Sequence, residues 1–333
     1  MQLAIAAATG LGVRTLTRHG MSERHARLVA AHLVDAAMCG HEFSSMARLL
    51  AIVEALQKRP PPAEIRVVHE TANSALIDGG DNIGYAVSIT AIDKAIEICG
   101  KSGVAIVGAN NTWFSGRLAY YVERAARQGY VAMHTTNTTA LVAPFGSIDR
   151  VMGTNPFAIA FPCEDDDPVI IDIGTSATSW GDVVLSAAKR ETIPAGVAVD
   201  AGGQPTIDPN EALAGAFLPW GGRRGSGLSM VSQLLGILAG SPVVVDGIGN
   251  YGLFFLVMDP ALLMPGGQFK SRVSEFRATV HAARPADGVS RVRFPGEGSL
   301  LKRRQAQAAG AIEVDDRVYS QILELSARNQ ELT

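Results

Sequence analysis

The chain has 333 residues, of which 47% are apolar and 18% are charged, and its formal net charge is −3 at pH 7. This length predicts two domains, or one large domain with a substantial core. The 29 basic residues nearly balance the 32 acidic residues. This balance and the apolar content exclude a disordered chain and a strongly basic nucleic-acid-binding surface, so no nucleic-acid partner is expected.

The cysteines and the apolar segments indicate where the protein works. Cys39, Cys99 and Cys163 are odd in number and widely spaced, so neither a disulfide framework nor a zinc site is expected. No apolar run reaches the roughly 18 residues that a membrane-spanning helix needs. The first 20 residues lack the basic leader and the cleavage site of a signal peptide. We therefore expect a cytoplasmic protein with no membrane partner.

The first 60 residues are predicted to be helical. Ser22 is a plausible N-cap for a helix that runs to about Met38, since Leu28, Val29 and Val34 form an apolar stripe along it. A second helical stretch covers 46–56 and stops before three consecutive prolines. We assign 1–72 to a helical N-terminal segment that carries substrate and dimer contacts.

The pattern then changes to strands that alternate with helices. Residues 65–69 and 74–80 read as short strands, and a helix with apolar residues at 89–99 ends near Gly103. A buried strand at 104–109 and an amphipathic helix at 116–129 follow. This is β-α-β-α order.

Between Tyr130 and Ile173 three strands follow one another with no room for crossover helices. Such strands pair antiparallel or through long loops, so the sheet should be mixed and not a doubly wound parallel one. The remaining predicted elements are helices at 209–217, 227–240 and 315–327 and a strand at 253–259. The predicted fold class is mixed α/β, with a central domain at 73–262 and a C-terminal segment at 263–333 that packs on the N-terminal part.

Two conspicuous motifs favour structural interpretations. The run 247–252 reads G-x-G-x-x-G, but a strand follows it, whereas dinucleotide binding needs a helix N-terminus there. We interpret it as a glycine-rich turn. The acidic run Glu164–Asp167 lies between two strands and is interpreted as a solvated loop, because a metal site needs converging ligands. No metal is predicted.

Other residues leave two interpretations open. The glycine- and arginine-rich run 221–227 precedes a helix and suits either an anion or a surface loop. Asp172 and Asp182 could orient a ligand or cap a turn. Arg48 could grip a substrate carboxylate or pair with Glu42 on the surface. His134 ends an apolar strand and is more typical of a core histidine than of a base.

Taken together, ten segments resemble the malate/L-lactate dehydrogenase type 2 family. Its members include sulfolactate, ureidoglycolate and diketogulonate enzymes and the Δ1-piperideine-2-carboxylate/Δ1-pyrroline-2-carboxylate reductases. The wording SWGD and GSGLSM is most similar to the last group. The matching segments are GHEFSSMARL (40–49), ALIDGG (75–80), FSGRLAYY (114–121), APFG (143–146), GTNPFAIAFP (153–162), IDIGTSATSWGD (171–182), IPAGVAVDAGGQPTIDP (193–209), LPWGGRRGSGLS (218–229), FFLVMDP (254–260) and PGE (295–297).

The resemblance implies a homodimer with a non-Rossmann nicotinamide-binding sheet and a small substrate that carries a carboxylate. It implies that Arg48 meets this carboxylate and that Thr154 lies beside the pocket. The subgroup resemblance, with Arg223 and Arg224 as possible partners of a 2′-phosphate, favours NADPH over NADH. The residues expected to bind the cofactor are Asp172, Ile173, Gly174, Thr175, Ser176, Gly222, Arg223, Arg224, Gly225, Gly296 and Glu297.

The chain departs from the family at the proton-transfer positions. The family motif S-H-G-x-x-R reads Phe43-Ser44-Ser45-Met46-Ala47-Arg48 here, so Ser44 stands where the resemblance places a catalytic histidine. A second family histidine is replaced by Phe114. Asp182, which partners the first histidine in the imine reductases, is retained and joins Ser44 as a candidate catalytic residue. Phe114, His41, Arg48 and Thr154 form the expected substrate-binding set.

Reduction of a ketone needs a proton on the forming alkoxide, and an unassisted serine is a poor donor, whereas an iminium is already cationic. The substitutions therefore favour an NAD(P)H-dependent reductase of a cyclic or N-substituted 2-imino acid that forms an L-amino acid. The alternatives are a 2-hydroxy acid dehydrogenase in which His41 or His134 transfers the proton, and a homologue that binds without catalysis.

Overall fold

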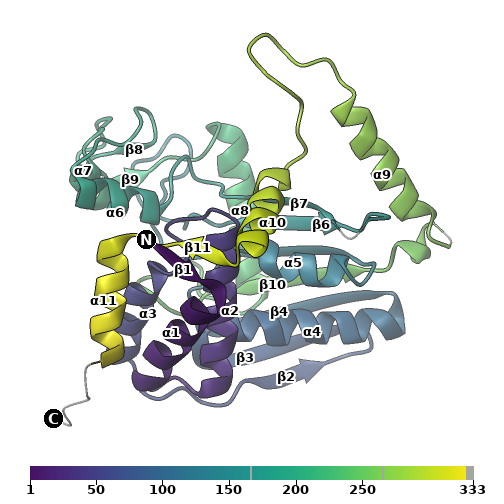
Figure 1. Ribbon diagram of the computed structural model, residues 1–333, viewed down its shortest axis with the longest axis horizontal. Coiled ribbons are helices and arrows are strands. Elements are labelled where there is room, and N and C mark those ends of the chain that lie inside the picture. The colour runs from purple at the N-terminus through teal and green to yellow at the C-terminus, as the bar shows by residue number, and fades with distance from the viewer. Residues whose placement is uncertain (166, 265, 328–333) are drawn as a thin grey trace. The chain divides into compact units, whose positions relative to one another are not determined.

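The computed structural model describes residues 1–165, 167–264 and 266–327. The chain forms two compact units, shown in Figure 1. Unit 1 comprises Met1–Ala63 and the segment from Glu297 onward, and unit 2 comprises Glu64–Gly296. The sequence analysis placed the boundaries after residues 72 and 262, whereas the units divide after residues 63 and 296. Each unit is described by itself.

Unit 1 is mainly helical, as expected for the first 60 residues. Its β1 pairs antiparallel with β11, with Leu3 opposite Ile312, and this pairing joins the two ends of the chain. The Ser22 hydroxyl accepts a hydrogen bond from the His25 backbone N–H at 3.3 Å, which confirms Ser22 as the N-cap. The elements of unit 1 are β1 (Gln2–Ala4), α1 (Ile5–Arg18), α2 (Glu23–Met38), α3 (Arg48–Gln57), α10 (Glu297–Ala309), β11 (Ala311–Glu313) and α11 (Asp316–Ala327).

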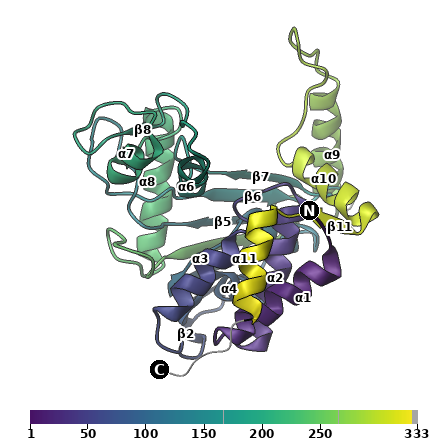
Figure 2. The same ribbon diagram turned by 60° about the vertical axis from the view of Figure 1, so that its left-hand side comes forward.

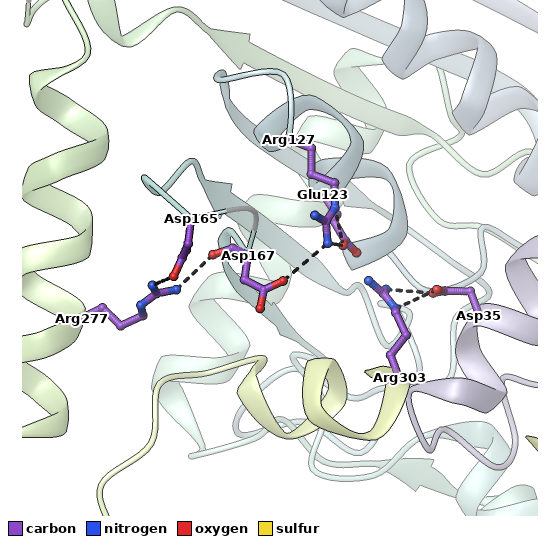
Figure 3. Close-up of polar contacts among 7 residues, drawn as sticks. All are labelled: Asp35, Glu123, Arg127, Asp165, Asp167, Arg277 and Arg303. Carbon is purple, nitrogen blue, oxygen red and sulfur yellow. Dashed lines mark hydrogen bonds and ion pairs between the residues drawn. The ribbon is translucent and has the colours of Figure 1, made fainter. Parts of the chain in front are cut away.

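A buried ion pair joins two helices of unit 1. Arg303 Nε lies 2.9 Å from Asp35 Oδ1, and Arg303 Nη2 donates to Asp35 Oδ2 at 3.1 Å (Figure 3). The two side chains are only 11% and 12% exposed. Because Asp35 belongs to α2 and Arg303 to α10, this pair fixes α10 on α2.

Unit 2 is built on a seven-stranded mixed sheet of order β2-β3-β4-β10-β5-β6-β7. Only the β3–β4 pair is parallel, because α4 forms the crossover between these two strands, and every other pair is antiparallel. The predicted mixed α/β fold is confirmed. The strands are β2 (Arg66–Glu70), β3 (Ser74–Ile83), β4 (Val104–Trp113), β5 (Val131–Thr136), β6 (Phe157–Phe161), β7 (Val169–Ile173) and β10 (Leu253–Met258).

Helices cover the two faces of this sheet. The Tyr121 ring of α5 lies 5.6 Å from the His134 ring on β5, whereas Thr135 donates to Ser232 of α8 at 2.8 Å. Since successive residues of a strand point to opposite faces, α5 and α8 lie on opposite faces. The remaining elements of unit 2 are α4 (Gly84–Ser102), α5 (Ala119–Ala126), α6 (Trp180–Lys189), β8 (Ala198–Val199), α7 (Pro209–Ala214), β9 (Ala216–Phe217), α8 (Arg223–Leu238), the 3-10 turn η1 (Pro260–Leu262) and α9 (Gln268–His281).

The boundaries of unit 2 follow from pairing at its two ends. Strand β2 belongs to it because it pairs antiparallel with β3. Helix α9 also belongs to it, because Ser274 Oγ accepts from the Glu164 backbone N–H at 3.1 Å and Arg277 pairs with Asp165 (Figure 3). The acidic run between β6 and β7 therefore carries structural ion pairs, since Asp167 also lies 3.8 Å from Arg127.

Two predicted helix boundaries are wrong. Helix α8 begins at Arg223 and not at residue 227, because Gly222 adopts a φ of +63° and serves as the N-cap. Helix α7 ends at Ala214 and not at residue 217, because Ala216 and Phe217 pair with β8. The run 247–252 precedes strand β10, as expected for a glycine-rich turn.

Candidate functional site

The unit 1 candidates lie in the loop before α3 and in its first turn. Arg48 is the first residue of α3, and its guanidinium carbon lies 5.2 Å from the centroid of the Phe43 ring. Ser44 is half-buried, whereas His41 is exposed, with its Nε2 3.4 Å from Ser299 Oγ. Arginine over an aromatic face keeps its in-plane N–H groups available for a carboxylate. This loop therefore carries a cation suited to an anionic ligand.

Phe114 occupies a strained position at the end of β4 in unit 2. Its φ is +50°, a left-handed conformation that costs a non-glycine residue roughly 1–3 kcal/mol. Its ring is buried and packs edge-on against Trp113 at 5.4 Å, and Trp113 Nε1 donates to the Asp81 carbonyl at 2.9 Å. Asp81 also has a positive φ, of 57°. Such strain concentrates at functional sites and gives this strand end an apolar aromatic pair.

Two of the family-like segments meet through Thr175. Its backbone N–H donates to the Thr154 carbonyl at 3.2 Å, and its hydroxyl donates to the Asn155 carbonyl at 3.1 Å. The Thr175 carbonyl in turn accepts from the Trp220 backbone N–H at 2.9 Å. The segments around residues 154, 175 and 220 are therefore neighbours, although they are distant in the sequence.

Asn155 connects this loop to α8. Its side-chain Nδ2 donates to the Ser229 carbonyl at 3.1 Å and to Gln233 Oε1 at 2.9 Å, and its Oδ1 accepts from the Thr138 backbone N–H at 3.1 Å. Asn155 is fully buried. The sequence analysis did not identify this network, although the small polar residues at 226, 229 and 232 could have indicated a helix face that buries hydrogen bonds.

The N-terminus of α8 presents bare backbone and two cations. Its N-cap, Gly222, supplies no side-chain hydrogen bond, so none of the first N–H groups is capped by this residue. A Cβ on Gly225 would lie 1.9 Å from the Trp220 carbonyl oxygen, so only glycine permits this turn. Arg223 and Arg224 are exposed, and Arg223 lies 5.3 Å from the ring centroid of Phe145. Uncapped amides, the helix dipole and arginines together favour a phosphate-bearing ligand.

Asp172 has a structural partner. Its Oδ2 accepts from the Ala119 backbone N–H at 2.8 Å and so caps the first turn of α5. Desolvation by the surrounding chain raises the pKa of this carboxyl, while the bond from Ala119 and the nearby Arg117 guanidinium oppose the rise. Of the two interpretations left open by the sequence, capping is the one seen here, although the residue as a whole is exposed.

Asp182 likewise takes part in a helix cap. Ser179 is the N-cap of α6, and its hydroxyl accepts from the Asp182 backbone N–H at 3.1 Å and donates to Asp182 Oδ2 at 2.7 Å. This reciprocal arrangement is a capping box. The side chain remains exposed, so one carboxylate oxygen is held while the group stays accessible to water.

The segment before α10 contains another close approach of backbone. Gly296 has a φ of +84°, and a Cβ there would lie 2.7 Å from the Ile170 carbonyl oxygen. Gly174, next to β7, has nothing within 4 Å of its ideal Cβ. Gly296 ends unit 2, and Glu297 begins α10 in unit 1.

His134 is a core residue. It is fully buried, its ring stacks on Phe255 at 3.8 Å, and its Nδ1 lies 3.0 Å from the Phe254 carbonyl oxygen. Desolvation lowers its pKa to about 3. The imidazole is therefore neutral at physiological pH and surrounded by aromatic rings, so the hypothesis that His134 transfers the substrate proton is wrong.

Two searches concern ligand classes outside this arrangement. Among the described residues, no group of three or more histidine, cysteine, aspartate or glutamate side chains could hold a metal ion. No helix within the described part of the chain is long and apolar enough to cross a membrane.

Comparison with known proteins gives matches over nearly the whole chain. The family model described as malate/L-lactate dehydrogenase matches residues 3–323. The L-sulfolactate dehydrogenase of Methanocaldococcus jannaschii is 31% identical, over 94% of this chain and 93% of that protein. The ureidoglycolate dehydrogenase (NAD(+)) of Escherichia coli strain K12 is 30% identical, over 92% of this chain and 91% of that protein.

A solved structure shows the same fold. The Δ1-piperideine-2-carboxylate reductase of Pseudomonas syringae aligns with a TM-score of 0.89 over 98% of this chain and 99% of its own, at 28% identity. This enzyme belongs to the subgroup that the wording around residues 179–182 and 225–230 resembles.

Proposed function

Because the chain belongs to the malate/L-lactate dehydrogenase family, and is therefore an NAD(P)-dependent oxidoreductase, we propose that it reduces a cyclic or N-substituted 2-imino acid to an L-amino acid. The family membership agrees with the resemblance noted in the sequence. The observation that carries the proposal is the loss of imidazole at both family positions, now Ser44 and Phe114.

The cofactor-binding residues of this chain suit a dinucleotide. The uncapped N-terminus of α8, with Gly222, Arg223, Arg224 and Gly225, fits a phosphate group. Two further sets would complete the binding surface, namely Asp172–Ser176 and the pair Gly296 and Glu297. When bound, the nicotinamide supplies the hydride. We propose NADPH over NADH, because the two exposed arginines can pair with a 2′-phosphate.

Arg48 would bind the substrate carboxylate. Its guanidinium can make two parallel hydrogen bonds to a carboxylate, and such charge-assisted bonds fix orientation as well as affinity. Phe114 offers an apolar surface that suits a ring or an alkylated nitrogen, and its edge-on contact with Trp113 holds its ring in place. Thr154 and His41 complete the proposed substrate-binding set.

Proton chemistry separates an imine from a ketone. Hydride addition to a ketone leaves an alkoxide that must be protonated, and the Ser44 hydroxyl is a weak acid at neutral pH. His134 is unavailable because it is buried and has a pKa of about 3. A protonated imine is cationic and accepts hydride with no further proton. The exposed Asp182 carboxylate, or a water molecule, would exchange the proton of the amine product.

A 2-hydroxy acid dehydrogenase is the second candidate. It is favoured by the relative named L-sulfolactate dehydrogenase, which is 31% identical. With His134 excluded, this activity requires His41, which is exposed and within 3.4 Å of a hydroxyl oxygen. Replacement of His41 by glutamine would then abolish the pH dependence of the rate near neutrality.

The deciding experiment compares NADPH oxidation with Δ1-piperideine-2-carboxylate and with pyruvate, for the wild type and for Ser44→His. We expect the wild type to reduce the imine far faster than the keto acid. Comparable rates on both substrates would contradict the proposal and favour the hydroxy acid candidate. If the wild type reduces neither and Ser44→His gains keto acid activity, the substrate class proposed here is wrong.

We also propose that the protein is a cytoplasmic homodimer, as the family resemblance implies. The surface that would form the dimer is considered next.

A further inference from the structure

Helix α8 has an inverted distribution of side chains. The face toward the sheet carries small and polar residues, since Ser226, Ser229, Ser232 and Gln233 are all buried. The opposite face is apolar and exposed: Leu234 and Leu238 expose 64% and 70% of their surface, and Met230 and Val231 are also exposed. An ordinary surface helix buries its apolar stripe, so the outer face of α8 lacks a cover in the isolated chain.

The apolar surface continues beyond the helix. Gln233 Nε2 donates to the Val243 carbonyl at 2.8 Å, which brings the following loop back along α8. Val243 is 71% exposed, and Val244 is exposed as well. We call the exposed residues of this surface the α8 ridge, which comprises Met230, Val231, Leu234, Leu238, Val243 and Val244.

Charge and spacing match the α8 ridge to its own image. The segment 225–245 contains no aspartate, glutamate, lysine or arginine. A contact about a two-fold axis places a patch on its own copy, so a neutral patch meets no like-charge repulsion. Met230, Leu234 and Leu238 are spaced four residues apart and form one i±4n row. Two such rows interdigitate in the commonest class of helix packing.

We propose that a second copy of this chain packs on the α8 ridge, and that this contact strengthens cofactor binding at the first turn of the same helix. The second part rests on the proposed function, because it uses the cofactor role of Gly222–Gly225. In the isolated chain α8 is held mainly by hydrogen bonds such as Thr135 to Ser232, and buries little apolar surface. Covering its outer face lowers the freedom of the whole helix, including its N-terminal turn.

The coupling is reciprocal. If association of the two copies favours cofactor binding, NADPH must favour association by the same factor. Couplings of this kind typically change affinity about 5- to 150-fold. Figure 2 shows α8 beside the strands of the sheet as one continuous helix, so its two functional regions belong to a single element.

The test uses the full chain with both Leu234 and Leu238 replaced by glutamate. The control is Leu263→Glu, which introduces the same charge at a leucine that is 95% exposed elsewhere in unit 2. Light scattering after size exclusion gives the molar mass, fluorescence titration gives the NADPH dissociation constant, and circular dichroism checks the fold. We expect a dimeric wild type and control. The double variant should be a folded monomer that binds NADPH at least about tenfold more weakly.

Each other outcome has a defined meaning. A monomeric wild type, or a double variant that stays dimeric, overturns the docking surface. A monomeric variant with unchanged NADPH affinity overturns the coupling. If the wild type is dimeric and the variant monomeric but neither binds NADPH or NADH, the proposed function fails while the docking surface stands.

Discussion

Asn155 Nδ2 donates a hydrogen bond to Gln233 Oε1 at 2.9 Å, and this contact joins the loop before β6 to the middle of α8. Both side chains are buried. The same amide group also donates to the Ser229 carbonyl, so one asparagine satisfies two acceptors on the helix that carries the proposed phosphate-binding turn. The position of α8 therefore depends on a polar contact more than on apolar packing.

Replacement of Asn155 by alanine should lower the free energy of unfolding by about 2–3 kcal/mol, because two buried acceptors lose their donor. Asparagine also tolerates the φ of +36° better than alanine does. Urea denaturation measures the loss. Asn210→Ala, at an exposed position in α7, is the matched control and should change stability by less than about 0.5 kcal/mol. Equal stability of the two variants would contradict the role of Asn155.

Gly225→Ala should weaken NADPH binding more than tenfold, because its Cβ would lie 1.9 Å from the Trp220 carbonyl oxygen and displace the first turn of α8. Gly227, one turn further on a free side of the helix, has nothing within 4 Å of its ideal Cβ. Gly227→Ala should keep the affinity and stabilise the helix by about 0.5–1 kcal/mol. Fluorescence titration and thermal unfolding compare the two, and similar affinities would refute the close approach.

Loss of either partner of the Asp35–Arg303 pair should lower the free energy of unfolding by about 2–4 kcal/mol, since a nearly buried charge remains unpaired. The double variant Asp35→Leu, Arg303→Met should recover most of this loss. The control is Arg27→Met, which breaks an exposed ion pair with Glu23 and should cost at most about 0.5 kcal/mol. If Arg303→Met is as mild as this control in urea denaturation, the pair does not anchor α10.

The buried His134 should make the native state sensitive to acid. Its pKa is lowered to about 3, below the value of about 6.5 expected in the unfolded chain. Between these pH values the unfolded chain binds a proton that the native state does not, so the free energy of unfolding falls as the pH is lowered. The slope from this residue is at most about 1.4 kcal/mol per pH unit.

The measurement is urea denaturation at pH 7 and pH 5 for the wild type, for His134→Phe and for His69→Gln. His134→Phe removes the titrating group and keeps an aromatic ring next to Phe255, so it should lose less stability than the wild type over this interval. His69 is exposed, so its replacement should leave the wild-type difference unchanged. An unaltered difference in His134→Phe would show that another group causes it.

Arg48→Met should raise KM for the imino acid about 10- to 150-fold, as expected for lost charge-assisted hydrogen bonds worth about 1.5–3 kcal/mol. Its NADPH dissociation constant should stay within twofold of the wild type, because Arg48 is assigned to the substrate. Arg14→Met, at an exposed position in α1, is the control. A KM unchanged from this control would remove Arg48 from the substrate-binding set.

Local signals explain which elements could be predicted. The N-cap at Ser22 and the consecutive strands after Tyr130 were predicted because capping residues and strand periodicity act over a few residues. Helix α9 was not identified, because none of its residues is buried and it therefore lacks an apolar stripe. Helix α1 was not identified either, because its alanine, glycine and threonine residues give weak helix signals.

The sequence by itself determined the family, the mixed sheet and the substitution of both proton-transfer histidines at Ser44 and Phe114. Only the tertiary structure decided what neighbouring segments do to each group. His134 is not a base because α5 and β10 surround it, and Asp172 caps α5 because β7 ends beside it. Helix α8 turns its apolar residues outward because its buried face bonds to loops far away in the sequence. Burial and hydrogen bonding between distant segments are properties of the fold, and no local pattern of residues encodes them.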